Sequence, residues 1–247
     1  MKTSSRAGFS SRSVSKIEIG GLQKTTLIDY PGRLAATVFL IGCNFRCPFC
    51  YSAELVLPDK IKNQPRISQK DFFSFLKERK GLLEAITVCG GEPSLNKDLP
   101  VFIRKIKKLG YLVKLDTNGS NPGMLKRLIK EKLVDYIAMD IKAPKENYEK
   151  AVGKVINVGD IEKSIDILKQ NKVDYEFRTT IVPTIHSKED IIKIVKWISP
   201  AKKYYLQSFR AEKMINSKLE KIKPYPKEFL SDIKKEIFRF FEVCEIR

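Results

Sequence analysis

One stretch of the sequence joins a strand-like run to three cysteines: Leu34-Ala-Ala-Thr-Val-Phe-Leu-Ile-Gly-Cys43-Asn-Phe-Arg-Cys47-Pro-Phe-Cys50. The run before the glycine is almost wholly apolar and contains β-branched and aromatic side chains, which favours a buried strand. The cysteines follow at once in a C-x3-C-x2-C pattern. The sequence therefore places a cluster of thiols at the carboxyl end of a strand.

Beyond this stretch the chain alternates between strand-like and helix-like segments. The expected strands are Leu34–Ile41, Ala85–Cys89, Tyr111–Thr117, Val134–Ile141, Tyr175–Val182 and Lys203–Phe209. The expected helices are Gln69–Lys80, Asp98–Leu109, Pro122–Lys132, Asp160–Gln170, Lys188–Ile198 and Lys227–Phe241. Alternating β/α units build a parallel sheet, because each right-handed crossover returns the chain in the same direction.

Six such units are too few to close an eight-stranded barrel, so they form either a partial barrel or an open doubly wound sheet. We predict an α/β fold: a partial (β/α)6 TIM-like barrel, with a short N-terminal β-hairpin within Lys16–Tyr30 around Gly20-Gly21. No low-complexity linker divides the chain, so residues 16–247 are expected to form a single domain. Residues 1–15 are Ser-rich and basic and are expected to be a disordered tail, with a transit peptide as the alternative.

Charge and cysteine content narrow the class of protein. The net charge of +18 fits a nucleic-acid partner, an acidic partner or an anionic substrate, and equally a solvated Lys-rich face. No apolar run approaches the roughly 18 residues of a membrane span. Of five cysteines, three fall within residues 43–50, which is typical of an intracellular metal or redox site rather than of a disulfide framework. A cytoplasmic protein without a membrane role is expected.

The three clustered thiols can wrap one soft metal centre while leaving one coordination position without a protein ligand from this segment. That arrangement suits a [4Fe–4S] cluster with one iron open to a small molecule. The alternative is structural zinc, with Cys89 or Cys244 as the fourth ligand.

Polar or metal-binding residues also stand at the ends of the later strands, where function gathers in both candidate folds. These candidates are Gly90, Gly91, Glu92 and Pro93, then Asp116, Thr117 and Asn118, then Asp140 and Lys142, then Arg178, and finally Gln207 and Arg210. His186, the one histidine of the chain, is expected to be a loop residue beside a Ser187 helix cap rather than a catalytic group.

The cysteine motif, with Phe49 before its third cysteine and Gly90–Pro93 about forty residues later, resembles the radical S-adenosylmethionine superfamily. The segment GLQKTTLIDYPG, residues 21–32, is similar to that of the glycyl-radical-enzyme activating proteins, especially the activators of anaerobic ribonucleoside-triphosphate reductase. The segments Asp116–Gly119, Asp140–Lys142 and Leu206–Arg210 also resemble this group.

The resemblance implies a [4Fe–4S] cluster and bound S-adenosylmethionine, whose amino and carboxylate groups chelate the fourth iron. It implies that three cysteines ligate the other irons: Cys43, Cys47 and Cys50. Phe49 and Tyr51 would lie near the adenine, and the backbone around Gly90–Glu92 would receive the amino group. In relatives, the positions of Asp116–Thr117 and Asp140–Lys142 line the cofactor pocket, sometimes around a monovalent cation. Arg178 and Gln207–Arg210 would contact the carboxylate or ribose.

Two features depart from the family pattern. Cys89 stands where relatives commonly carry Ser or Thr, so it is expected to be a small buried thiol, and Cys244 an incidental one. Ser52 replaces a frequent Asn after Tyr51.

The implied function is an activating enzyme that reductively cleaves S-adenosylmethionine, so that a 5′-deoxyadenosyl radical removes a Cα hydrogen from a glycine of a partner enzyme. A flavodoxin- or ferredoxin-type electron donor and an anaerobic cytoplasm are implied with it. Two alternatives remain open. One is a radical enzyme acting on a small molecule or RNA, as in RNA modification or deazaguanine synthesis. The other is a non-enzymatic zinc or iron–sulfur module.

Overall fold

The computed structural model describes residues 17–247, and the expected tail lies outside the described residues. The strands are β1 (Ile19–Thr26), β2 (Ala35–Leu40), β3 (Ala85–Gly90), β4 (Leu112–Thr117), β5 (Tyr136–Asp140), β6 (Asp174–Ile181), β7 (Ala201–Ser208) and β8 (Phe241–Ile246). The α-helices are α1 (Ala53–Val56), α2 (Pro58–Ile61), α3 (Gln69–Glu78), α4 (Leu99–Lys108), α5 (Pro122–Lys130), α6 (Tyr148–Val152), α7 (Val158–Lys169), α8 (Lys188–Ile198) and α9 (Lys227–Ile237).

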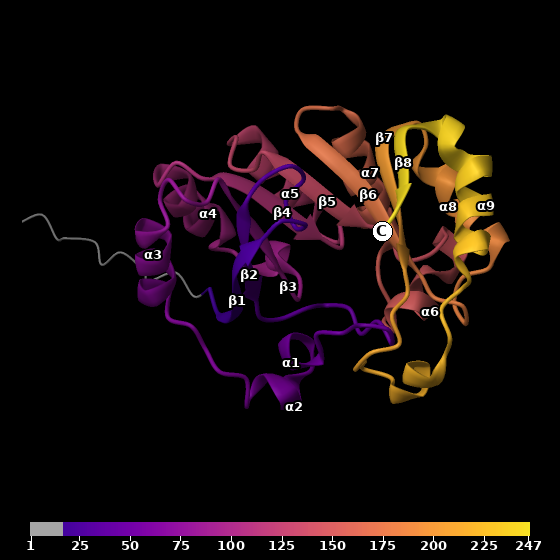
Figure 1. Ribbon diagram of the computed structural model, residues 1–247, viewed down its shortest axis with the longest axis horizontal. Coiled ribbons are helices and arrows are strands. Elements are labelled where there is room, and N and C mark those ends of the chain that lie inside the picture. Colours follow the sequence, from indigo (N-terminus) through magenta and orange to yellow (C-terminus); the bar gives the residue numbers. More distant parts are fainter. Residues whose placement is uncertain (1–16) are drawn as a thin grey trace, which may run out of the picture.

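The eight strands form one sheet in chain order. β1 runs antiparallel to β2, and every later neighbouring pair is parallel. The sheet curves but does not close, because its edge strands β1 and β8 do not pair with each other among residues 17–247 (Figure 1). The predicted α/β fold and partial barrel are confirmed.

The helices cover the convex face of the sheet through periodic apolar stripes. In α4 the buried side chains Leu99, Phe102, Ile103 and Ile106 recur at helical spacing, while the last turn is rich in Lys. Basic residues there also suit the negative end of the helix dipole. The helices therefore supply the apolar core on one side of the sheet.

The concave face of the sheet is polar, in contrast to most parallel sheets. Along β4, Val113 and Leu115 pack into the helix-side core, while Lys114 and Asp116 face cavities. This follows from the two-residue period of a strand, which sends alternate side chains to opposite faces. The concave face can therefore hold charged groups beside a ligand.

Two elements differ from the sequence-based expectation. The expected hairpin within residues 16–30 is a single strand, β1, which contains Gly20-Gly21 and pairs with β2. The expected helix Lys227–Phe241 ends at Ile237, and Phe241–Ile246 forms β8 beside β7. Both differences arise because strand pairing across the sheet overrides local sequence preference.

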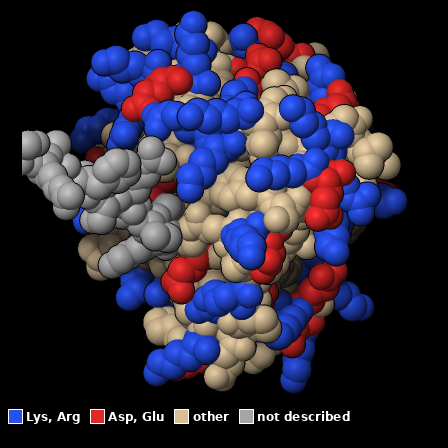
Figure 2. All heavy atoms as spheres, turned by 90° about the vertical axis from the view of Figure 1, so that its left-hand side faces the viewer, with Lys and Arg blue, Asp and Glu red and all other residues tan. Residues whose placement is uncertain are grey.

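Lys and Arg crowd the surface, with Asp and Glu between them, on the side of the molecule that includes α3 (Figure 2). This view is compatible with a solvated basic face and equally with an acidic partner. Among the described residues, no helix is long and apolar enough to cross a membrane.

Candidate cofactor site

The cysteine loop follows β2 and is braced by backbone contacts. The guanidinium of Arg46 donates to the carbonyl oxygens of Cys43 and Phe45, at 2.7 and 2.6 Å. The Arg46 N–H donates to the carbonyl of Val152 at 2.8 Å, which ties the loop to the end of α6. Buried aromatic rings at Phe45 and Phe49 anchor it further. The loop therefore presents its thiols from a fixed backbone.

The three thiols line one cavity of about 300 Å³. Burial raises the pKa of Cys43 to about 12 and that of Cys47 to about 11, and it raises the pKa of Cys50 as well. The metal-free thiols are therefore protonated at neutral pH, and a soft metal centre that binds them must displace the protons. Three sulfur donors around one cavity fit an iron–sulfur cluster.

The other two cysteines lie on different strands of the sheet. Cys89, on β3, lines the same cavity, whereas Cys244, on β8, is buried among apolar residues and lines no part of that cavity. Among residues 17–247, no three Cys, His, Asp or Glu side chains converge on one metal-ion position. A tetrahedral zinc ion needs its sulfur ligands within about 2.3 Å of it, and Cys244 lines no part of the cavity that holds the three clustered thiols.

The glycine turn after β3 is shaped by the neighbouring strand. Gly90 has a φ of +121°, and a Cβ there would lie 2.3 Å from the backbone of Leu40. A Cβ on Gly91 would lie 2.1 Å from the carbonyl oxygen of Gly42. The N–H groups of Gly91 and Glu92 donate to Leu40 and Gly42, at 2.9 and 2.7 Å. With these two N–H groups engaged, carbonyl oxygens of the turn remain to accept a hydrogen bond from a ligand, which suits a protonated amino group.

The buried side chain of Glu92 joins the ends of β3 and β4. Its Oε1 accepts from the N–H of Ser94 at 3.0 Å and from the hydroxyl of Thr117 at 2.8 Å. Its Oε2 accepts from the N–H of Asn118 at 2.6 Å. The Asn118 amide in turn donates to the side chain of Asn44, in the cysteine loop, at 3.0 Å. Glu92 thus connects the two turns, and Asn118 connects them to the cysteines.

Five charged residues form a continuous chain across β4, β5 and β6. Lys114 pairs with Asp116, and Arg178 Nη1 donates to the other oxygen of Asp116 at 3.1 Å. Arg178 Nε donates to Asp140 at 2.8 Å, and Lys142 donates to the second oxygen of Asp140 at 2.9 Å. These residues carry three positive and two negative charges; four of them line the first cavity, and Lys114 lines the cavity that adjoins it.

These groups keep their charges because each stands beside an opposite one. Burial acts to raise the pKa of Asp140, but Arg178 and Lys142 outweigh it and lower that pKa to about 2. Arg178 and Lys114 likewise lower the pKa of Asp116 against the effect of burial. Burial acts to lower the pKa of Lys142, but Asp140 raises it above its usual range. All three groups are therefore ionised at neutral pH.

Comparison with known proteins assigns this site to a family. Residues 37–198 match the sequence profile described as the Radical SAM superfamily. The chain belongs to that superfamily. It is therefore an enzyme that uses a [4Fe–4S] cluster and S-adenosylmethionine.

Individual relatives of this radical SAM enzyme carry different names. A Methanocaldococcus jannaschii protein named provisionally as a glycyl-radical enzyme activating enzyme is 36% identical over 221 residues, covering 86% of this chain and 88% of the relative. An S-adenosylmethionine-dependent nucleotide dehydratase from Lacinutrix mariniflava is 25% identical over 195 residues, covering 76% of this chain and 40% of that protein. The structure of Streptococcus suis SuiB bound to S-adenosylmethionine shares the fold, with a TM-score of 0.62, 14% identity, and coverage of 83% of this chain and 48% of that one.

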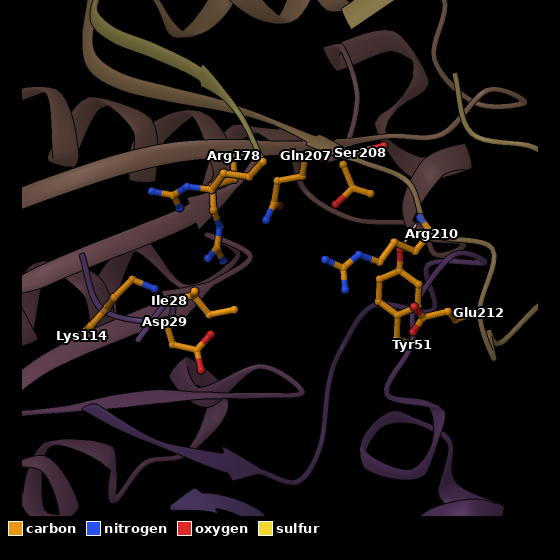
Figure 3. A pocket seen from close by; sticks show the side chains of 11 residues that line it. Ile28, Asp29, Tyr51, Lys114, Arg178, Gln207, Ser208, Arg210 and Glu212 are labelled. Carbon is orange, nitrogen blue, oxygen red and sulfur yellow. Dashed lines mark hydrogen bonds between the residues drawn. The ribbon is translucent and has the colours of Figure 1, made fainter. Parts of the chain in front are cut away.

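A second cavity, of about 610 Å³, adjoins the first in this radical SAM enzyme (Figure 3). Four residues line both cavities: Tyr51, Arg178, Thr180 and Gln207. The hydroxyl of Tyr51 accepts from the N–H of Arg210 at 3.0 Å, which fixes the segment after β7 beside the cysteine loop. In Figure 3, Asp29 and Arg210 lie on opposite sides of this space.

The structure brings the predicted site residues together, with two exceptions. All of the others line the first cavity. Pro93 instead begins the buried turn after Glu92, and Arg210 lines the second cavity. The functional roles assigned to all these residues remain predictions.

His186 lies just before the Ser187 cap of α8, as expected. Its Nδ1 accepts from the N–H of Val182 at 3.0 Å, so Nε2 carries the proton and donates to the carbonyl of Lys142 at 2.7 Å. Lys114 and Thr180 also line the cavities, although they were not among the predicted site residues. The two-residue period counted from Asp116 and from Arg178 would have indicated both.

Proposed function

We propose that this radical SAM enzyme generates a glycyl radical on a partner protein, with anaerobic ribonucleoside-triphosphate reductase as that partner. The 36% identical relative, named provisionally as an activator of glycyl-radical enzymes, supports the first part. The resemblance of residues 21–32 to the reductase activators supports the second.

The observation that carries the proposal is the position of the loop between β1 and β2. Ile28 and Asp29 line the second cavity, which opens onto the cofactor site. Leu27 and Ile28 are 76% and 83% exposed, although both side chains are large and apolar. Adjacent apolar side chains at a cavity mouth are suited to contact with another protein. A partner bound there can present a glycine to the cavity.

The proposal assigns roles to the residues of the site. The [4Fe–4S] cluster is held by Cys43, Cys47 and Cys50. The remaining cofactor contacts are assigned to Phe49, Tyr51, Gly90, Gly91, Glu92, Asp116, Thr117, Asn118, Asp140, Lys142, Arg178, Gln207 and Arg210, with Pro93 stiffening the glycine turn.

Bound together, the cluster and S-adenosylmethionine supply a 5′-deoxyadenosyl radical, once an external flavodoxin- or ferredoxin-type donor provides one electron. The chain positions the reactants and restricts water. Carbonyl oxygens of the turn at Gly90–Glu92 orient an amino group, and Arg178 offers a guanidinium to a carboxylate. Because an exposed cluster is oxygen-labile, we expect the enzyme to work in an anaerobic cytoplasm.

Electron paramagnetic resonance tests the proposal. The reconstituted enzyme, reductant and S-adenosylmethionine are incubated anaerobically with an anaerobic ribonucleotide reductase, and we expect a glycyl doublet with release of 5′-deoxyadenosine. Cys47→Ala should abolish both signals. Formation of 5′-deoxyadenosine with no doublet would reject this reductase as the partner.

A pair of surface variants tests the docking loop. Ile28→Ser should weaken the doublet while leaving 5′-deoxyadenosine formation without partner unchanged. Leu82→Ser is the matched control, because Leu82 is also a large apolar residue, 61% exposed, but lines neither cavity. Equal doublets from both variants would contradict the placement of the partner.

A nucleotide-like small molecule is the second candidate substrate. Arg210 lines the second cavity, and its guanidinium makes no hydrogen bond or ion pair with residues 17–247. A free guanidinium suits a phosphate group, and one relative is named a nucleotide dehydratase. Nucleotide-stimulated 5′-deoxyadenosine formation that disappears in Arg210→Gln would favour this candidate.

A further inference from the structure

The two aspartates of the cofactor cavity have no carboxylate oxygen left without a protein cation. The oxygens of Asp116 accept from Lys114 and from Arg178. Those of Asp140 accept from Arg178 and from Lys142. Any additional cation would therefore have to share an oxygen with one of these side chains or displace it.

Lys114 is the most buried of the five linked charged residues, with 2% of its side chain exposed. It lies on β4 two residues before Asp116, so both side chains point to the concave face. Among residues 17–247, Asp116 is its ion-pair partner. A buried ammonium persists only when it is paired with an opposite charge, so the two groups depend on each other.

Lys114 gives this group of charged residues its excess positive charge. With Lys114, three cations face two carboxylates, and an added monovalent cation would raise the local excess to two positive charges. Without Lys114, Arg178 and Lys142 would balance Asp116 and Asp140, and one oxygen of Asp116 would become free. That oxygen could then hold a monovalent cation, and the original excess of one positive charge would be restored.

We propose that the Lys114 ammonium is a built-in counter-cation of the cofactor pocket, standing where an exchangeable monovalent cation would otherwise bind beside Asp116. Lys114 is a positioning residue: it fixes Asp116 and, through it, Arg178. The proposal concerns the cofactor pocket and does not depend on which partner receives the radical.

Cation binding to the full chain tests this directly. Sodium-23 nuclear magnetic resonance linewidths and thermal unfolding are measured for wild type and Lys114→Met, with and without the reconstituted cluster, in sodium, potassium or choline chloride at equal ionic strength. Wild type should show no saturable sodium binding and the same Tm in all three salts. Lys114→Met should unfold roughly 10 °C lower in choline. It should also bind sodium saturably and regain part of the lost Tm in sodium or potassium.

Three further variants make the result specific. Lys114→Met/Asp116→Asn should lose the acquired sodium binding, because it lacks the free carboxylate. Lys114→Arg should remain insensitive to the choice of salt. Lys107→Met removes a lysine paired with Asp135 outside the cavity and should gain no sodium binding.

Two outcomes would overturn the proposal. One is saturable sodium binding by wild type that disappears in Asp116→Asn. The other is a folded Lys114→Met that gains no cation response. If Lys114→Met fails to fold, Lys114→Gln replaces it, and the wild-type measurement decides independently of either variant. None of these readouts requires a glycyl radical, so they separate this inference from the proposed function.

Discussion

Replacing Glu92 by glutamine should separate the two turns that frame the cofactor cavity. Both oxygens of the carboxylate accept hydrogen bonds from backbone N–H groups: Oε1 from Ser94 and Oε2 from Asn118. Glutamine has the same shape but one oxygen. Either orientation of its amide therefore directs an NH2 group at a backbone N–H.

The size of the effect follows from these contacts. Losing one hydrogen bond to a charged acceptor costs about 1.5–3 kcal/mol, and leaving a buried donor unpaired costs about 1–3 kcal/mol more. Part of this is offset, because burial raises the pKa of Glu92 and glutamine relieves the burial of a charge. We expect a net loss of about 3 kcal/mol in the free energy of unfolding, and a Tm lower by roughly 6–12 °C.

Urea unfolding of the cluster-free chain under anaerobic conditions measures this loss. Glu84→Gln is the matched control: the Glu84 carboxylate also accepts two hydrogen bonds, from Arg33 and the N–H of Leu34, but it is exposed. The control should unfold at the wild-type midpoint. Equal midpoints for Glu92→Gln and Glu84→Gln would refute the reasoning that the Glu92 carboxylate holds the two turns together.

The contribution of Glu92 to the free energy of unfolding should also depend on pH. A raised carboxyl pKa means that the folded state binds the proton more tightly than the unfolded state does. This contribution to stability is present below the unfolded pKa of 4.5 and is lost as the pH rises through the raised pKa of Glu92. The stability gap between wild type and Glu92→Gln should therefore narrow as the pH rises above 4.5.

Two further predictions concern the charge chain and the glycine turn. Asp140→Asn should cost about 2 kcal/mol near neutral pH, because the pKa of Asp140 is lowered from 3.8 to about 2. This contribution is present above pH 3.8 and is lost as the pH falls toward 2, so urea midpoints of the two proteins should converge in acid. Gly91→Ala should shift the turn and abolish S-adenosylmethionine binding in equilibrium dialysis, because its Cβ would lie 2.1 Å from the Gly42 oxygen. Gly123→Ala, whose Cβ would meet nothing closer than 3.7 Å, should bind the cofactor normally.

Much of the fold could be predicted because its signals are local. The apolar stripe of α4 and the capping residue Ser187 of α8 identify those helices from neighbouring residues alone. The end of the chain was harder, because Phe241–Ile246 continues an amphipathic helical run. Pairing with β7 makes this segment a strand, and that pairing cannot be predicted from neighbouring residues in the sequence.

The sequence by itself determined the βα alternation, the thiol cluster and the strand ends that carry polar residues, because these depend on residue type and spacing along the chain. The tertiary structure alone decided which charges meet. Lys114 became an ion-pair partner inside a cavity, and the side chain of Glu92 became a link between two turns. The reason is that the energy of a buried charge depends on what lies within a few ångströms of it in space, and the curvature of the sheet sets those distances.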